Sequence, residues 1–197
     1  MRLKIVQAGE RVLREKARPL SPQEIRSEIV RQLIESMRET MRDAPGVGLA
    51  APQVGLELQL AVIEDRVEYH RSATPEQLAE RERVPVEFHV IINPGIELLD
   101  RPNIEHFEGC LSVTGYSAIV PRARRVRVDC LDENGEPRRI EASGWYARIL
   151  QHEIDHLQGT LYLDRMHSRS FMTTENVTRY WKDLPIAEVR SALKIGS

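Results

Sequence analysis

Two histidines and a glutamate, spaced for one face of a helix, are the residues of this chain with the clearest chemistry. The pentapeptide His152-Glu153-Ile154-Asp155-His156 places its two histidines about 40° apart on a helical wheel. Two imidazoles at that spacing can bind one metal ion, and Glu153 beside them can take a proton from a water at the metal. The pentapeptide therefore indicates metal-assisted hydrolysis, without indicating of what.

A metal held by such a helix usually takes a third protein ligand from elsewhere and leaves one position for water. A histidine six residues after His156 would complete the metzincin pattern, but Tyr162 stands there, so that reading fails. Glu175 could serve as in a thermolysin-like site, although no strong helical pattern surrounds it. Cys110, beside Gly109 in a stretch without periodicity, is the best third ligand, because a thiolate and two imidazoles form a tetrahedral site with one open corner.

The second cysteine has a different setting. Cys130 lies on the apolar side of an alternating strand, and we interpret it as a small buried hydrophobic residue. Two cysteines in a chain of this length do not indicate a disulfide framework.

A glycine-containing loop, residues 46–53, is the third segment that could do chemistry. Its sequence Gly-Val-Gly-Leu-Ala-Ala-Pro-Gln lacks the Lys-Ser/Thr of a phosphate-binding loop and opens no βαβ unit, which disfavours phosphate binding. Small residues would let this backbone lie against an extended peptide, and the Gln53 amide could polarise a carbonyl without competing for the metal. Taken alone, however, a loop glutamine is more often only a surface hydrogen bonder.

One early helix, several strands and one late helix are expected to position these segments. A Ser21–Glu24 capping box followed by an apolar stripe predicts a helix over about 22–42. Strands are predicted at 58–63 and 89–92, followed by a β-rich region at 116–140 with a hairpin turn at 132–135. A helix over about 144–157 has apolar residues on two sides, so we expect it to run through the middle of an α+β domain.

Length and composition are those of an ordinary globular domain. The chain has 197 residues, of which 41% are hydrophobic and 29% charged, and we predict a single domain over 1–197. A net charge of −2 gives no reason to expect nucleic-acid binding, and no apolar run approaches the roughly 18 residues of a membrane span. The charged stretch 64–87 is predicted to be a surface insertion with a short helix near 75–83. We expect 167–197 to be a C-terminal extension with a short helix near 175–182.

Three segments taken in order resemble the signature motifs of peptide deformylases. They are residues 46–53, Glu108-Gly109-Cys110-Leu111-Ser112 and the His152–His156 pentapeptide, and the similarity extends from about residue 5 to 166. The 64–87 stretch and Gly144-Trp145-Tyr146-Ala147-Arg148 resemble the organellar-type branch more than the commonest bacterial one. The resemblance implies an α+β fold, with mixed or antiparallel sheets wrapped around the motif helix. It also implies a hydrolase that removes the formyl group from N-formylmethionyl nascent chains and releases formate.

The resemblance implies a catalytic role for several residues. Glu153 would take a proton from the attacking water and deliver it to the departing amine. The Gln53 side-chain amide and the Leu111 backbone N–H would stabilise the oxyanion. The metal ligands would be Cys110, His152 and His156.

Other residues would contact the substrate or support the metal site. Glu108, paired with Arg122, would steady the cysteine loop. Many bacterial relatives have an arginine at the position of Ser117, which leaves open how the substrate beyond its first residue is held here. Arg148 could contribute instead, or it could be only a partly exposed helix arginine. The substrate-contacting residues would be Val47, Gly48, Leu111 and Ile149.

The expected cofactor is one divalent metal ion, Fe²⁺ by resemblance, with Zn²⁺, Ni²⁺ or Co²⁺ able to substitute. N-formylmethionyl nascent peptides at the ribosome exit are the expected partners, with no nucleic acid or membrane partner indicated. Residues 1–7 resemble a cytosolic start, which favours the bacterial cytosol and leaves a processed organellar form and the oligomeric state open. Two other functions also stay open: a metallopeptidase with a different third ligand, and a non-catalytic module in which the metal only staples the fold.

Overall fold

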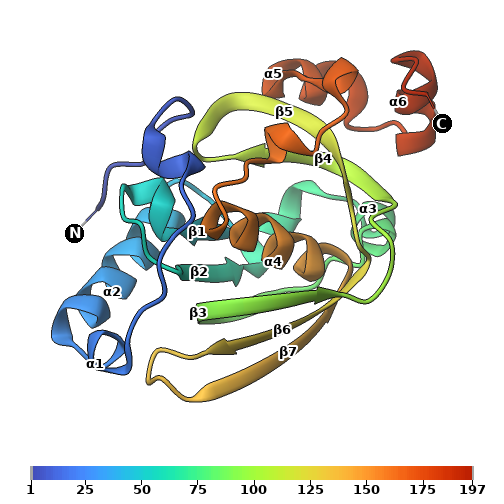
Figure 1. Ribbon diagram of the computed structural model, residues 1–197. Coiled ribbons are helices and arrows are strands. Elements are labelled where there is room, and N and C mark those ends of the chain that lie inside the picture. The colour runs from blue at the N-terminus through green and yellow to red at the C-terminus, as the bar shows by residue number, and fades with distance from the viewer. Residues whose placement is uncertain (1, 197) are drawn as a thin grey trace.

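Two antiparallel sheets with one helix between them make up the fold, in a computed structural model that describes residues 2–196 (Figure 1). The larger sheet has the order β1-β2-β3-β6-β7 and the smaller one the order β4-β5-β8. The strands are β1 (Gly48–Ala50), β2 (Leu60–Asp65), β3 (Val86–Leu98), β4 (Ile104–Cys110), β5 (Val113–Arg122), β6 (Arg125–Leu131), β7 (Pro137–Ser143) and β8 (Met172–Thr173). The expected α+β class with antiparallel sheets is confirmed.

Two long helices cover opposite faces of the five-stranded sheet. Helix α4 (Gly144–Leu157) packs on one face and α2 (Glu28–Asp43) on the other. Strand β2 alternates accordingly: Ala61 and Ile63 join the core around α4, whereas Leu60 and Val62 join the core around α2. The motif helix is therefore central, as its two-sided apolar pattern predicted.

The early helix is interrupted, which the apolar stripe did not predict. The capping box of Ser21 and Glu24 starts α1 (Pro22–Ile25), as expected. Ser27 then starts α2, because its hydroxyl accepts a hydrogen bond from the backbone N–H of Val30 at 3.2 Å. A serine that caps a new helix competes with continuation of the previous one.

The predicted strands and turn are present with adjusted ends. The strand expected at 58–63 is β2, and that expected at 89–92 is the middle of β3. The turn at 132–135 is confirmed: the N–H of Asp132 donates to the carbonyl of Glu136 at 2.9 Å, and Gly135 has φ of 82°. Cys130 is 6% exposed in the α4 core, which confirms it as a buried hydrophobic residue, and burial raises the pKa of its thiol to about 11.

Two segments outside the sheets are tied to them by ion pairs. The 64–87 stretch carries α3 (Pro75–Glu80) and is closed by Arg83, which forms two hydrogen bonds to Asp65 at 2.7 and 2.8 Å. At the C-terminal end, Glu105 of β4 lies 2.8 Å from His167 and 3.0 Å from Arg190. Beyond β8 lie α5 (Thr174–Asn176), a π-helical turn (Val177–Trp181) and α6 (Ile186–Ala192). Short 3₁₀ turns occupy Arg11–Arg14, Ala51–Val54, Val67–Ser72, Tyr162–Asp164 and Ser168–Ser170.

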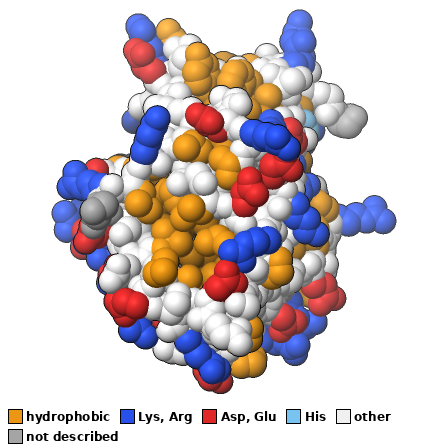
Figure 2. Space-filling model, turned by 60° about the vertical axis from the view of Figure 1, so that its left-hand side comes forward, with side chains coloured by type: hydrophobic (Ala, Val, Ile, Leu, Met, Phe, Trp, Pro, Cys, Tyr) orange, Lys and Arg blue, Asp and Glu red, His pale blue; other side chains and the backbone are white. Residues whose placement is uncertain are grey.

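The surface mixes hydrophobic and charged side chains. Figure 2 shows a broad hydrophobic area on the face that it displays, with side chains of both charges around it. This face therefore carries no extended region of a single charge. Between residues 2 and 196, no helix has the length and apolar character needed to cross a membrane.

Candidate metal centre and active site

Cys110, His152 and His156 converge beside a pocket of about 590 Å³. One ligand atom from each lies within 4.8 Å of the other two, and Cys110 Sγ is 3.3 Å from His156 Nε2. In a tetrahedral site, a sulfur about 2.3 Å and a nitrogen about 2.1 Å from the metal lie about 3.6 Å apart. The three donors are therefore spaced for one metal ion.

An irregular strand end places the cysteine. The β4–β5 register shifts between Gly109 and Cys110, so that Cys110 lies opposite Val113 in a tight connection. The backbone N–H of Ser112 points at Cys110 Sγ from 3.4 Å. A bulged strand end thus aims a sulfur at the motif helix, which sequence periodicity alone could not reveal.

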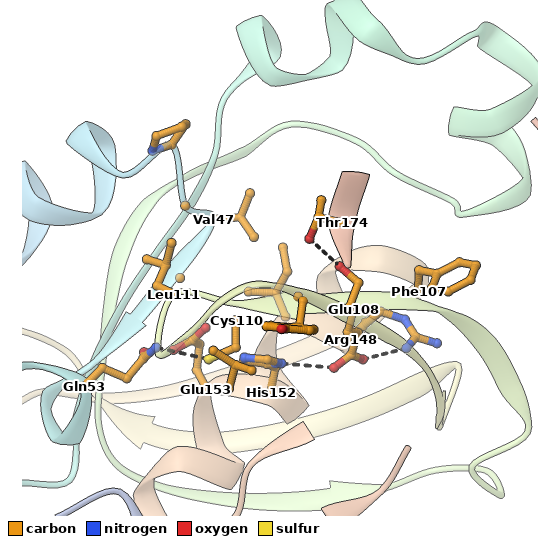
Figure 3. Close-up of a pocket in the computed structure, with 18 of the residues that line it drawn as sticks. Val47, Gln53, Phe107, Glu108, Cys110, Leu111, Arg148, His152, Glu153 and Thr174 are labelled. Carbon is orange, nitrogen blue, oxygen red and sulfur yellow. Dashed lines mark hydrogen bonds and ion pairs between the residues drawn. The ribbon is translucent and has the colours of Figure 1, made fainter. Parts of the chain in front are cut away.

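Glu108 orients the first histidine. Its Oε2 accepts a hydrogen bond from His152 Nδ1 at 3.0 Å, which leaves His152 Nε2 free to face the metal position. Arg122 donates to both oxygens of Glu108, each at 3.0 Å. Burial opposes the negative charge of Glu108, but Arg122 and His152 hold the pKa of this carboxyl well below its ordinary value. The carboxylate is consequently a fixed anion behind the histidine (Figure 3).

Arg148 is paired with Glu108, so its guanidinium is not a free cation in the pocket. Its side chain is 4% exposed and donates to Glu108 Oε1 at 2.6 Å. It also donates to the carbonyls of Val120 at 2.9 Å and Ile104 at 2.7 Å. The alternative of a partly exposed helix arginine is wrong, because β4 and β5 cover this side of the helix. Arg148 does line the pocket, so a substrate contact stays a prediction.

Asp155, inside the pentapeptide, is a charged partner that sequence reasoning missed. It lies 2.5 Å from Arg122 Nη1 and accepts two hydrogen bonds from Arg165, at 2.6 and 2.7 Å. Arg122 is thereby held between two carboxylates. Asp155 could have been identified from the sequence. It lies about one turn after His152 on a helix that has few positions facing solvent.

Glu153 enters the site only because residue 48 is a glycine. A Cβ atom at Gly48 would lie 2.2 Å from Glu153 Oε1 and 2.5 Å from its Cδ. The Glu153 side chain is buried, and Oε2 has no hydrogen-bond partner among residues 2–196. Burial raises the pKa of this carboxyl to about 7, against the opposing charge of His152. A carboxyl with a pKa near neutrality can both take and return a proton.

Gln53 is a fixed donor inside the site, not a surface hydrogen bonder. It is 1% exposed, and its Oε1 accepts from the N–H of Ala50 at 2.8 Å, which settles which end of the amide faces the metal position. Nε2 lies 3.5 Å from Cys110 Sγ and 3.4 Å from Ser112 Oγ. Figure 3 shows Gln53 reaching Cys110 from the side opposite Arg148. The remaining expected contact residues, Val47, Gly48, Leu111 and Ile149, all line the pocket.

Comparison with known proteins agrees with this arrangement. Residues 2–171 match the family model described as polypeptide deformylase. The chain belongs to this family. It is 48% identical over 183 residues to peptide deformylase 1A, chloroplastic, of Solanum lycopersicum, covering 93% of this chain and 64% of that protein. The chain thus spans just under two thirds of that relative's length. The expected likeness to organellar deformylases is confirmed.

Bacterial deformylases are similar to nearly the same degree. Peptide deformylase 3 of Streptomyces avermitilis is 46% identical over 195 residues, covering 98% of this chain and 84% of that one. The crystal structure of a class I type b peptide deformylase from Acinetobacter baumannii, bound to Met-Ala-Ser, superposes with a TM-score of 0.72. It is 33% identical and covers 84% of this chain and 99% of that chain. Fold and motif arrangement are therefore those of the deformylase family.

Two residues from outside the motifs also line the deformylase pocket. Arg83 comes from the 64–87 stretch and lies over the Trp145 ring, 5.4 Å from its centroid. Thr174 comes from the chain beyond the family match. No sequence pattern pointed to either residue, because both reach the pocket through long-range packing.

Neither Tyr162 nor Glu175 belongs to the metal-binding cluster found among the described residues. The Tyr162 hydroxyl donates to the carbonyl of Tyr116 at 3.2 Å, so it is engaged in packing. Glu175 is exposed on the C-terminal segment.

Proposed function

We propose that this chain is a peptide deformylase, which removes the N-formyl group from the N-terminal formylmethionine of newly synthesised proteins and releases formate. The observation that carries the proposal is the meeting of three separate segments in one pocket. Gln53, Cys110 and Glu153, one from each segment, line the same space. Membership of the deformylase family supports the same reaction.

The metal-binding residues in this proposal are Cys110, His152 and His156. Burial holds the pKa of His156 well below its ordinary value, which keeps a nitrogen lone pair available for a metal. When bound, a divalent ion would polarise the formyl carbonyl and make water a stronger nucleophile. One thiolate and two imidazoles suit Fe²⁺, Zn²⁺, Ni²⁺ and Co²⁺; we propose Fe²⁺ on the resemblance to deformylases.

In the proposed mechanism the protein moves one proton and holds one developing charge. The Glu153 carboxylate takes the proton of the attacking water and delivers it to the amine as the C–N bond breaks. As the formyl carbon becomes tetrahedral, its oxygen gains negative charge and accepts hydrogen bonds from Gln53 Nε2 and the Leu111 backbone N–H. Loss of one such donor typically lowers turnover by about 10²–10³.

Substrate selection follows from the size of the formyl group. Formyl is the smallest acyl group, so close walls admit it and exclude internal peptide bonds. We propose that Val47, Leu111 and Ile149 contact the methionine side chain, and that Gly48 forms a hydrogen bond to the substrate backbone. A related enzyme from Acinetobacter baumannii has been crystallised with Met-Ala-Ser, which is the sequence a deformylated tripeptide would have.

The place of action follows from the substrate. Formylated N-termini exist only on new chains, so we propose that the enzyme acts on nascent chains as they leave the ribosome. The bacterial cytosol is the compartment that we propose, and the similarity to a bacterial deformylase supports it.

The test is formate release from N-formyl-Met-Ala-Ser by anaerobically purified protein, with the metal content measured on the same sample. We expect rapid release that a chelator abolishes and Fe²⁺ or Ni²⁺ restores. A fully metallated protein that released no formate would contradict the proposal. If the same protein cleaved internal peptide bonds, it would be a metallopeptidase.

A further inference from the structure

Part of the pocket is built by chain that lies outside the family match. Strand β8 pairs with β5, so that Thr173 lies opposite Tyr116 and Met172 opposite Ser117. This pairing brings Thr174 to the pocket wall, where its Oγ1 is 3.1 Å from Ser117 Oγ. Figure 3 shows Thr174 at the upper edge of the pocket, pointing toward it.

The pair of hydroxyls has hydrogen-bonding capacity to spare. Each hydroxyl offers one donor and two acceptor lone pairs, and the contact between Ser117 and Thr174 uses one donor and one lone pair. Within residues 2–196 neither oxygen has a second hydrogen-bond partner. One O–H group and several lone pairs therefore remain for a ligand in the pocket.

The wall around this pair is uncharged. Its neighbours along β5 are Gly115 and Tyr116, and Val113 lies at the start of the strand. The charged residues that line the pocket are engaged or buried elsewhere: Arg83 is paired with Asp65, Glu108 and Arg148 with each other, and Glu153 lies behind Gly48. A ligand beside Ser117 and Thr174 would thus meet neutral hydroxyls.

The position of the pair relative to the metal centre identifies which part of a substrate it meets. The formyl group must lie beside Cys110 and Glu153. Ser117 is paired with Gly109, the residue before Cys110, and Thr174 is exposed at the surface. A peptide chain that left the metal centre along β5 toward solvent would therefore meet Ser117 first and Thr174 next.

We propose that Ser117 and Thr174 form a subsite for the main chain of the substrate's second and third residues; this inference rests on the proposed deformylase function. An O–H group donates to a peptide carbonyl and a hydroxyl oxygen accepts from a peptide N–H. Neither contact depends on which side chains the substrate carries. Such a subsite suits an enzyme that meets every sequence following an initiator methionine.

The first test compares two substrates on the same variants. N-formylmethionine N-methylamide ends before the second residue's carbonyl, whereas N-formyl-Met-Ala-Ser extends across the proposed subsite. We expect Thr174→Val and Ser117→Ala each to lower the tripeptide-to-methylamide ratio of kcat/KM about two- to tenfold, the worth of one hydrogen bond. Thr178→Val, an exposed threonine in the same segment outside the pocket, is the matched control and should leave the ratio unchanged.

The second test adds a charge to the neutral wall. Wild-type protein should release formate from N-formyl-Met-Ala-Asp and N-formyl-Met-Ala-Lys at rates within about twofold. Thr174→Arg should favour the Asp peptide about fivefold at low salt, and added salt should remove the preference.

Unchanged ratios in both hydroxyl variants, or strong charge discrimination by wild-type protein, would overturn the subsite. Absence of formate release from every substrate would instead reject the underlying function, and the subsite with it. Thermal unfolding of each variant separates lost binding from lost folding.

Discussion

The inner wall of the pocket and its outer rim are held together by different forces. The inner wall is the buried network of Glu108, Arg122, Arg148 and His152, whose side chains are 3–12% exposed. The outer rim consists of the Ser117–Thr174 pair and Tyr116, and the ring of Phe171 stacks on that of Tyr116 with centroids 4.9 Å apart. Those two rings are 43% and 40% exposed.

The residues proposed for catalysis and those proposed for substrate contact therefore differ in how firmly they are held. Breaking a buried ion pair typically costs about 3–5 kcal/mol, whereas an aromatic pair contributes about 0.5–1.5 kcal/mol beyond its area. The proposed metal-binding groups therefore lie on the part of the molecule that costs more to displace. The rim, built in part beyond residue 171 where the family match ends, can vary at low cost.

The largest expected effect comes from Glu153, the proposed proton-transfer group. Glu153→Gln keeps size and shape but cannot take a proton, so we expect turnover on N-formyl-Met-Ala-Ser to fall by about 10²–10⁴. Metal content should stay at the wild-type level, measured by elemental analysis of the same sample. Raising the pH should not restore activity, because bulk hydroxide does not replace a positioned base. Near-normal turnover would refute the mechanism.

A second effect on the inner wall should come from a single methyl group. Gly48→Ala places a Cβ 2.2 Å from Glu153 Oε1, so the carboxylate must move away from its proposed catalytic position. A displacement of about 1 Å can cost about 100-fold in rate, and steady-state kinetics would measure it. Gly95→Ala in β3 is the control, since its nearest atom would lie 3.9 Å away; equal losses in both variants would exclude the steric argument.

A third variant removes one of the two guanidinium groups on Glu108. Arg148→Met leaves the carbonyls of Ile104 and Val120 without their donor, and we expect a loss of about 3 kcal/mol in the free energy of unfolding. Metal affinity should fall about tenfold, because the group orienting His152 is less firmly held. Urea unfolding and chelator competition measure the two effects.

Arg165→Met is the matched control for that variant. Its guanidinium also binds a carboxylate of the network, Asp155, but the Arg165 side chain is 47% exposed. An exposed ion pair contributes at most about 1 kcal/mol. If the two variants lost equal stability, burial would not be the origin of the inner wall's rigidity.

The sequence predicted the inner wall far better than the rim. The two histidines follow from helical spacing, and the Glu108–Arg122 pair was expected from the resemblance. The role of Arg148 was missed because its acceptors lie on β4 and β5, and no local pattern shows which strands cover a helix. No sequence pattern predicted that Thr174 lines the pocket, because β8 has only two residues and pairs with a strand more than fifty positions earlier. The early helix was predicted as one continuous helix, and it is interrupted for a local reason, the cap at Ser27.

The smallest expected effect lies at the rim and tests whether it is independent of the inner wall. Phe171→Ala removes the ring stacked on Tyr116, which loosens the start of β8 and with it Thr174. We expect a loss of about 0.5–1.5 kcal/mol in unfolding free energy, with KM for the tripeptide raised about two- to threefold and kcat unchanged. Tyr180→Ala, an exposed ring on the same segment, is the control. A fall in kcat comparable to that of Gly48→Ala would mean that the rim transmits its disorder to Glu153, and the two regions could no longer be treated as separate.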